Sequence, residues 1–404
     1  MHDYSFMTIN LGSLPKPNSK NSNWACSEEV NVEVYTSFFN NKQFPKVSII
    51  TPSFNQGEFI EQTIRSVLLQ NYPNLQYIVI DGGSTDNTVQ ILEKYSSWID
   101  YWVSEPDRGQ SHAINKGLEI CDGEWFNWIN SDDYLMPGAI AKMIEASNEH
   151  PNVKIITGAT ANIQDEKVMG IYSATIPENT KFPFFNMGIN QPGSLLSLSA
   201  VKACNGVRED LDLCMDLDLW LRILLRNSID DVVKISDTVA AYRYHSQSKT
   251  CSSQDVFALE EFSVLLDIYQ ELSPFEIPKT LKVLRAQCKA AEGKYLINKI
   301  YNQDDLTELF FDRLIVSDSL LFRALTKVPS MYKNIFTYFA ETLEQLDLNS
   351  LYGHNASRVR AVSQLRAMQN QGRLSIVGVL SSLKNLSFFP TVKELSRIAI
   401  KGNK

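Results

Sequence analysis

The sequence predicts an α/β fold, in which a mostly parallel sheet carries helices on both faces and is followed by a mainly helical C-terminal region. Short β-branched or aromatic segments alternate with segments of helical period between residues 45 and 130. Each strand-like segment ends in a polar loop, and helical period alone continues over residues 255–346. Right-handed crossovers in such a sheet bring the loops that follow the strands to one edge.

The expected elements follow in order after Pro45, where a stretch rich in Asn, Ser and Pro gives way to regular patterns. Four strands are expected at Val47–Thr51, Tyr77–Ile80, Tyr101–Val103 and Trp125–Ile129. Three helices are expected between them, at Glu58–Gln70, Asp86–Tyr95 and Gln110–Ile120. Beyond these, we expect strands at Ile155–Thr157 and Ser194–Leu198 and a helix at Leu217–Leu225. The predicted parts are an irregular N-terminal arm (1–44), an α/β domain (45–253) and a helical C-terminal domain with a basic tail (254–404).

The composition excludes several classes of protein. Hydrophobic residues make up 44% and charged residues 21% of 404 residues, which is typical of globular chains and unlike disordered or fibrous ones. A net charge of −8 disfavours nucleic acid as a partner. No two of the six cysteines form a CxxC pair, which argues against a zinc ribbon or a redox dithiol. With no leader-like start and no apolar run of about 18 residues, we expect a cytoplasmic protein.

The positive charge is concentrated at the C-terminal end. Residues 356–404 hold nine basic residues and one acidic residue, a net charge of +8, so residues 1–355 carry −16 of the total of −8. Two interpretations of this tail stay open. It either packs on the acidic α/β domain, or it lies in an anionic membrane interface and holds the protein peripherally at the inner face of the membrane.

Four polar loops follow the first four strands. They are 51–55 (TPSFN), 81–86 (DGGSTD), 107–111 (DRGQS) and 130–133 (NSDD). Each loop alone is explained almost as well by a turn or a helix cap. Neither GxGxxG nor GK[ST] is present, which disfavours a dinucleotide fold or a P-loop. Their joint placement at one sheet edge is what predicts a site.

The adjacent carboxylates of Asp132 and Asp133 suggest that this site holds a cation. Their repulsion is costly unless a positive charge offsets it, and hard oxygen ligands favour Mg²⁺ or Mn²⁺, which in turn would hold a diphosphate. The alternative is a helix N-cap.

Two later segments add candidate groups. Asp216, in MDLDLWLR, could take a proton from an alcohol, although an acidic first helical turn explains it too. In YRYHSQSKT, His245 could contact a metal or a phosphate, and Arg243 or Lys249 could neutralise a leaving diphosphate. A lone histidine is more often structural.

Taken together, these segments resemble a known family. The stretch VSIITPSFNQGEFIEQTIRSVLLQNYPNLQYIVIDGGSTDNT, followed by DRGQSHAINKGL, WINSDDYLMPGAI, MDLDLWLR and YRYHSQSKT, is similar to the family 2 inverting glycosyltransferases of GT-A fold. The resemblance covers about residues 45–250, which would be the catalytic domain. It implies a nucleotide-sugar donor (a UDP-sugar first), a divalent metal (Mn²⁺ or Mg²⁺), and a saccharide or lipid-linked glycan acceptor, as in bacterial polysaccharide biosynthesis.

The resemblance also implies roles for individual residues. The nucleotide would be bound by Thr51, Pro52, Phe54, Asn55, Asp81, Ser84, Arg108, Gly109 and Asp132, with Asp81 accepting the N3–H of a pyrimidine. The metal would be bound by Asp133, with Asp132 and His245 as further ligands. Asp216 would be the general base.

The sequence departs from the family pattern at two positions. Asn130 stands where the family has the first acid of its DxD stretch. Met215 replaces the acid before the base, so a supporting carboxylate is missing unless Asp218 replaces it. Two other functions stay open, an inactive glycan- or nucleotide-binding module and a sugar-1-phosphate nucleotidyltransferase. The latter should carry a glycine-rich loop after the first strand, where this chain has 51–55 (TPSFN).

Overall fold

The structure is a computed structural model, which describes residues 11–17, 29–31, 44–175, 188–246, 248–249, 254–272, 279–302, 306, 310, 314 and 324. The chain divides into two compact units, Met1–Ser252 and Ser253–Lys404. The basic tail predicted over residues 356–404 lies outside the described residues.

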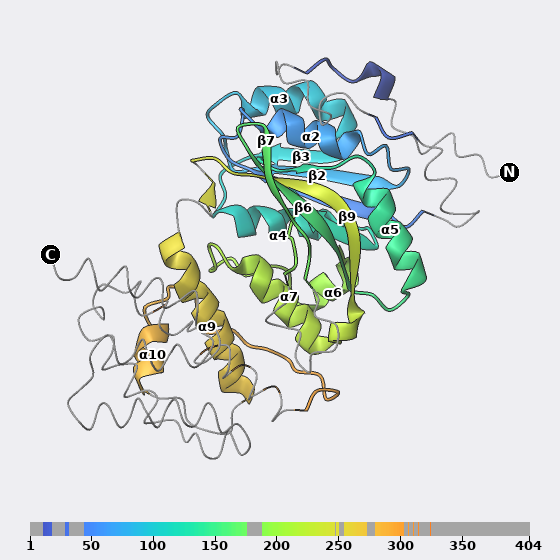
Figure 1. The fold of residues 1–404 in the computed structure, drawn as a ribbon. Coiled ribbons are helices and arrows are strands. Elements are labelled where there is room, and N and C mark those ends of the chain that lie inside the picture. Colours follow the sequence, from blue (N-terminus) through green and yellow to red (C-terminus); the bar gives the residue numbers. More distant parts are fainter. Residues whose placement is uncertain are drawn as a thin grey trace. The chain divides into compact units, whose positions relative to one another are not determined.

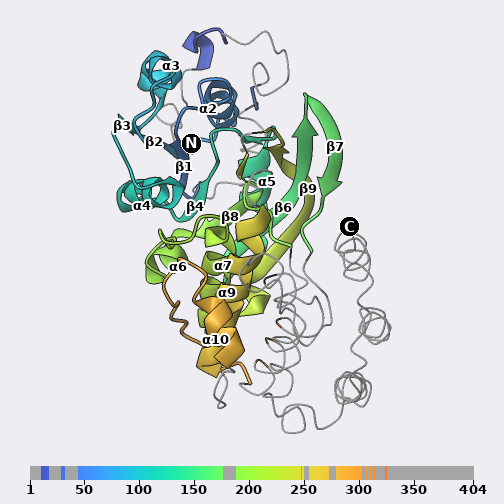
Figure 2. The ribbon, with the colours of Figure 1, turned by 90° about the vertical axis from the view of Figure 1, so that its left-hand side faces the viewer.

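The first unit is built on a nine-stranded sheet (Figures 1 and 2). The strand order is β3-β2-β1-β4-β8-β6-β9-β5, and β7 pairs with β6. The strands are β1 (Val47–Ser53), β2 (Leu75–Asp81), β3 (Tyr101–Ser104), β4 (Trp125–Trp128), β5 (Tyr134–Leu135), β6 (Ile155–Gln164), β7 (Lys167–Tyr172), β8 (Ser194–Ser197) and β9 (Val232–Arg243).

The predicted α/β class is confirmed, and the parallel pairing holds for the part of the sheet that carries the first four loops. Four pairings are parallel: β3 with β2, β2 with β1, β1 with β4, and β6 with β9. The pairings of β4 with β8, β8 with β6, β6 with β7, and β9 with β5 are antiparallel. The sequence pattern does not predict β7 or β9, because neither segment shows a strict alternation of apolar and polar residues.

Helices cover both faces of the sheet. They are α2 (Ile60–Leu68), α3 (Thr88–Tyr95), α4 (Gln110–Ile120), α5 (Ala139–Glu149), α6 (Leu198–Ala203) and α7 (Met215–Arg226). Helices α2 and α3 lie on one face and α4 lies on the other (Figures 1 and 2). Helix α4 packs directly on β1 and β2. A Cβ at Gly117 of α4 would lie 2.7 Å from Cδ1 of Ile50, so this close approach requires a glycine.

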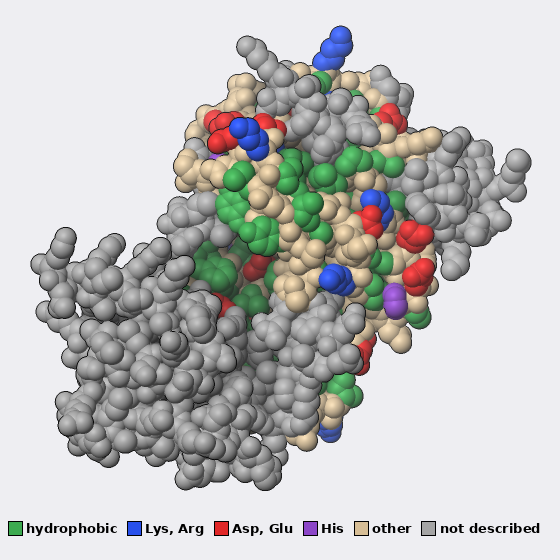
Figure 3. All heavy atoms as spheres, viewed as in Figure 1, with side chains coloured by type: hydrophobic (Ala, Val, Ile, Leu, Met, Phe, Trp, Pro, Cys, Tyr) green, Lys and Arg blue, Asp and Glu red, His purple; other side chains and the backbone are tan. Residues whose placement is uncertain are grey.

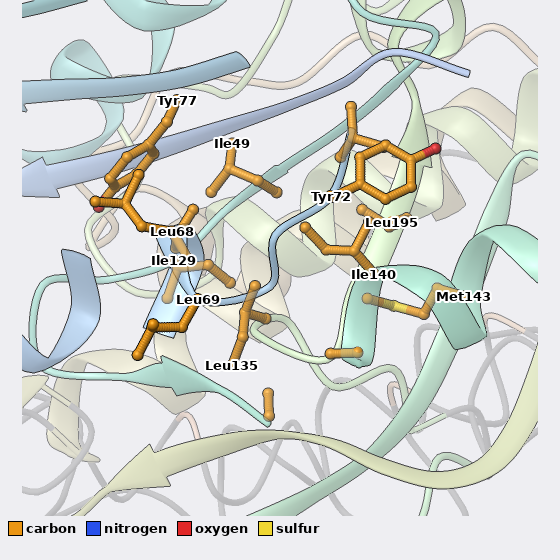
Figure 4. Close-up of a cluster of buried hydrophobic side chains, with 14 of the residues drawn as sticks. Ile49, Leu68, Leu69, Tyr72, Tyr77, Ile129, Leu135, Ile140, Met143 and Leu195 are labelled. Atoms are coloured by element: carbon orange, nitrogen blue, oxygen red, sulfur yellow. The ribbon is translucent and has the colours of Figure 1, made fainter. Parts of the chain in front are cut away.

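The main core lies between the sheet and helices α2 and α5. Buried side chains from these elements meet there (Figure 4), among them Ile49, Leu68, Tyr77, Ile140 and Met143. On the outer part of the sheet, β7 instead exposes four apolar side chains, Val168, Met169, Ile171 and Tyr172. Figure 3 shows apolar side chains gathered on the face where β7 runs in Figure 1.

Helix α2 is buried on all sides although half of its residues are polar. Each polar group has a partner from a neighbouring element: Glu61 forms an ion pair with Lys94 of α3, and Arg65 donates to the carbonyl oxygen of Pro15 at 2.7 Å. Buried polar groups need such partners, because an unpaired one carries its full desolvation cost. Within the predicted N-terminal arm, residues 11–17 and 29–31 therefore dock on this helix and its C-terminal end.

The described part of the second unit contains two helices, α9 (Gln254–Leu272) and α10 (Lys279–Arg285). Asp267 of α9 and Arg285 of α10 form a buried, bidentate ion pair with distances of 2.7 and 2.9 Å. Among the helices that the structure describes, we find none with the length and apolar character needed to cross a membrane.

Candidate functional site

The register of the parallel strands brings the polar loops to one edge of the sheet. Ser53 of β1 is level with Asp81 of β2, and Asp81 is level with Ser104 of β3. Ile50 of β1 is level with Trp128, two residues before the Asn130 turn. The loops after β1, β2, β3 and β4 therefore leave the sheet at the same edge, which is where α/β proteins bind their ligands.

The first two loops are joined by hydrogen bonds. The amide of Asn55 donates to Oγ of Ser84 at 2.7 Å, and the amide of Thr85 donates to Oδ1 of Asn55 at 2.8 Å. The amide of Gly57 donates to Asp86 at 2.9 Å. Asn55 has a φ of 52°, a left-handed conformation that asparagine tolerates better than most residues. The polar side chains of these loops thus hold the loops against each other.

Asp81 is fully buried, and both oxygens of its carboxylate accept hydrogen bonds. One oxygen accepts from Oγ of Ser84 at 2.5 Å. The other accepts from the amides of Ser84 and Gly83, at 2.8 and 3.2 Å, and from Oγ of Ser104 at 2.6 Å. Because Asp81 is fully buried, the loop would have to open before a pyrimidine N3–H could reach the carboxylate. In this conformation Asp81 orders the loop after β2, and its predicted contact to a base stays a prediction.

The remaining predicted nucleotide contacts of the first loop differ in their access to solvent. Thr51 and Pro52 are buried in β1, and the Thr51 hydroxyl lies 3.0 Å from the hydroxyl of Tyr77. These two residues can support a pocket from beneath but cannot touch a ligand without rearrangement. Phe54, by contrast, is 59% exposed, so its ring is available for a base to stack on.

Arg108 and Gly109 lie at the N-terminal end of α4. Gly109 has a φ of 115° and precedes the helix, which requires glycine. The guanidinium of Arg108 is exposed and donates to Glu209 at 2.6 and 3.1 Å, while Asn115 donates to the other oxygen of Glu209 at 3.2 Å. Burial opposes the shift, but these hydrogen bonds and the Arg108 charge together lower the pKa of Glu209. Glu209 thus holds Arg108 in place, a role that the sequence pattern does not reveal.

The Asn130 turn sends its two carboxylates in different directions. Oγ1 of Thr63 on α2 donates to the carbonyl oxygens of Ser131 and Asp133, at 2.9 and 2.7 Å. With the backbone held in this way, Asp133 is fully buried while Asp132 keeps 19% of its side chain exposed. The two acids that the sequence groups together therefore have different environments.

Asp133, the first predicted metal ligand, is fully buried in this structure. Its carboxylate accepts from the amide of Arg243 at 3.0 Å and from the side chain of Asn130 at 3.2 Å. Burial, followed by the charge of Asp132, raises the pKa of Asp133 well above its usual value. A positive charge beside the two carboxylates would oppose this shift, because an opposite charge favours the ionised form. The role of Asp133 as a metal ligand stays a prediction.

Asp132 instead faces His245. Nε2 of His245 lies 2.9 Å from Oδ2 of Asp132, although 113 residues separate them in the sequence. Strand β9 ends at Arg243 and delivers His245 to the sheet edge, where its ring packs on that of Phe59 with 4.6 Å between centroids. Phe59 precedes α2 and is a further site residue that periodicity alone does not reveal.

The donor set of Asp132 and His245 fits a weakly held divalent cation. Among the described residues, no group of three or more His, Cys, Asp or Glu side chains could hold a metal ion. A Mg²⁺-type site needs no such group, since it often uses one or two protein ligands together with substrate phosphates and water. The 2.9 Å between Nε2 of His245 and Oδ2 of Asp132 is the length of a hydrogen bond, so a cation would replace the shared proton and take both groups as ligands.

Asp216 lies in the first turn of α7 and is partly exposed. Nζ of Lys249 donates to the carbonyl oxygen of Asp212 at 3.4 Å, so the segment that follows His245 reaches the loop before α7. Asp218 does not supply the missing supporting acid. It is fully buried and forms an ion pair with Arg222 at 2.6 Å.

The carboxyl edge of an α/β sheet, where these loops gather, is the usual place for a ligand site in this class of fold. The model of the family "Glycosyl transferase family 2" matches residues 48–212, so this segment of the chain is similar to that family, as the sequence motifs predict. Its members are transferases, and the solved structure described next confirms the predicted GT-A fold.

The chain is similar to several curated glycosyltransferases. It is 29% identical over 197 residues to an uncharacterized glycosyltransferase of Rickettsia typhi, covering 47% of this chain and 62% of the relative. It is 36% identical over 125 residues to TuaG of Bacillus subtilis, a putative teichuronic acid biosynthesis glycosyltransferase, covering 30% and 49%. Residues 1–349 of S. aureus TarS, solved with UDP-GlcNAc, share the fold with a TM-score of 0.55 and 17% identity, covering 88% of this chain and 92% of that TarS segment. The chain spans less than two thirds of the length of the two curated relatives from Rickettsia typhi and Bacillus subtilis.

Proposed function

We propose that this protein transfers a sugar from a UDP-sugar to a hydroxyl of a saccharide or lipid-linked glycan, with inversion at the anomeric carbon, in the synthesis of a cell-surface polysaccharide. The observation that carries the proposal is the placement of Asp132 and His245 at the sheet edge, next to the loops that follow β1 and β2. The family match, the name of TuaG and the UDP-GlcNAc bound to TarS support the choice of donor and pathway.

In this proposal, Asp132 and His245 hold the divalent cation, and Asp133 supports the turn. The cation, Mn²⁺ or Mg²⁺, supplies positive charge to the diphosphate on which negative charge develops. Phe54 offers its exposed ring to the uracil, and Arg108, held by Glu209, lies over the ribose.

Asp216 acts as the general base. Its carboxylate takes the proton of the acceptor hydroxyl while the acceptor oxygen forms a bond to the anomeric carbon. The bond from that carbon to the diphosphate oxygen breaks at the same time, and its electron pair leaves with the UDP. Attack from the side opposite the leaving group inverts the anomeric configuration.

The test is a measurement of UDP release from a panel of UDP-sugars, with acceptor saccharides and Mn²⁺. We expect Asp216→Asn to lower kcat by roughly 10²- to 10⁴-fold and to leave donor binding near that of the wild type, since a base acts only on the acceptor. Asp237→Asn is the matched control, because Asp237 is an exposed acid that pairs with Lys142 on the domain surface.

The anomeric proton coupling of the product, measured by NMR, tests the stereochemistry. A product with the same anomeric configuration as the donor contradicts inversion. Undiminished turnover in Asp216→Asn contradicts the assigned base. Binding of UDP-sugars without any transfer would favour the inactive binding module over an enzyme.

A further inference from the structure

Arg243 is a buried cation next to the candidate metal ligands, with 5% of its surface exposed. Its Nη1 donates to the carbonyl oxygen of Asp132 at 2.7 Å, and its Nη2 donates to Oε1 of Gln62 on α2. Its guanidinium carbon lies 5.0 Å from the ring centroid of Phe59 and 5.1 Å from that of Tyr134. The side chain is therefore enclosed by α2 and the turn after β4 and does not reach toward a leaving diphosphate.

These contacts connect the three segments that carry the Asp132–His245 pair and its support. The side chain of Arg243 holds the backbone of Asp132, and its own amide donates to the carboxylate of Asp133. His245 lies two residues after Arg243, just beyond the end of β9. The ring of Phe59 contacts two of these groups, the guanidinium of Arg243 and the ring of His245.

A guanidinium is an expensive group to bury, since desolvation of a charge must be offset by well-placed partners. Of the side-chain hydrogen bonds described for Arg243, one goes to a backbone carbonyl and one to a neutral amide. The planar fork of arginine can make both at once, and two aromatic faces can flank it, whereas the ammonium of lysine cannot reproduce this geometry.

We propose that Arg243 is a positioning residue for the Asp132–His245 pair. By fixing the peptide carbonyl of Asp132 against α2, it keeps the Asp132 carboxylate facing His245, so that both side chains can serve as ligands of one cation. Gln62, on α2, accepts the second hydrogen bond of the Arg243 guanidinium. This inference rests on the proposed function, because it assigns the pair to a metal.

The test measures Mn²⁺ binding directly, with saturating UDP but without turnover, from the electron paramagnetic resonance signal of free Mn²⁺, and UDP without protein gives the background. We expect Arg243→Lys to weaken Mn²⁺ binding by roughly 10- to 100-fold, the range typical for partners that orient metal ligands. Gln62→Leu should weaken it in the same direction and by less, and Gln62→Glu, which keeps an acceptor for Arg243, should bind more tightly than Gln62→Leu.

Arg65→Lys is the matched control. Arg65 is also a buried arginine next to α3, with 6% exposure, and it also donates to a backbone carbonyl, that of Pro15, but away from the pair. We expect this variant to melt at a lower temperature and to bind Mn²⁺ within about twofold of the wild type.

The outcomes separate positioning from simple stabilisation. If Arg243→Lys and Gln62→Leu lower the melting temperature as Arg65→Lys does, but keep the wild-type affinity for Mn²⁺, Arg243 is only structural and the inference is wrong. If Arg243→Lys does not fold, the comparison of Gln62→Leu with Gln62→Glu decides by the same criterion. A wild-type protein that releases UDP but binds no Mn²⁺ overturns the metal pair itself, while sugar transfer stands.

Discussion

Substitution of Asp81 measures whether this carboxylate orders the loop after β2. In Asp81→Ala, the donors that meet one carboxylate oxygen, two backbone amides and the hydroxyl of Ser104, lose their acceptor. An unsatisfied buried donor costs roughly 1–3 kcal/mol, and water can rehydrate part of a loop at the sheet edge, so we expect a loss of about 3 kcal/mol in the free energy of unfolding.

Asp81→Asn should cost much less. Its amide oxygen can accept the same three donors, while its amide nitrogen faces Oγ of Ser84, a hydroxyl that can rotate to accept. We expect a loss of about 1 kcal/mol. At about 2–4 °C per kcal/mol for a unit of this size, the alanine variant should melt about 6–12 °C lower and the asparagine variant about 2–4 °C lower.

The assay is urea unfolding followed by fluorescence, with UDP affinity measured by calorimetry on the same samples. If Asp81 orders the loop, UDP affinity follows stability, and the asparagine variant keeps most of both. A stable Asp81→Ala protein that has lost UDP binding would refute the reasoning and return Asp81 to direct contact with the base.

Three further predictions concern stability. In the second unit, Asp267→Ala leaves the buried Arg285 without its carboxylate, and we expect a loss of about 3–5 kcal/mol in urea unfolding, whereas replacing both residues with apolar ones should cost less. Burial opposes the shift at Asp86, but hydrogen bonds to its carboxylate lower its pKa from 3.8. The stabilisation that the Asp86 carboxylate provides is therefore complete above pH 3.8 and is lost as the pH falls through the lowered pKa. Asp86→Asn should flatten the decline of melting temperature below about pH 4, and an unchanged acid profile would count against this. Gly117→Ala should cost about 1–3 kcal/mol because its Cβ meets Ile50, and a neutral effect on melting temperature would show that α4 can shift.

Much of the first unit follows from local sequence pattern. The strands at Val47, Tyr77 and Trp125 and the helix at Gln110 are found where apolar spacing predicts them, because periodicity reflects which face of a single element is buried. The parallel connectivity then requires the polar loops to share one edge, and the register of Ser53 with Asp81 places them there. The strand β9, which delivers His245, lacks such a pattern, because its burial comes from neighbours that are distant in sequence.

The sequence by itself determined the class of fold, the family resemblance, and the set of loops from which a site is built, since all three depend on spacing along the chain. Only the tertiary structure decided which of these polar groups keep contact with solvent and which are buried and hydrogen-bonded. Whether Asp81 is occupied by loop donors, whether Asp132 or Asp133 keeps contact with solvent, and whether Arg243 points inward are set by groups up to 181 residues away. Desolvation and hydrogen bonding depend on these neighbours, and no local pattern contains them.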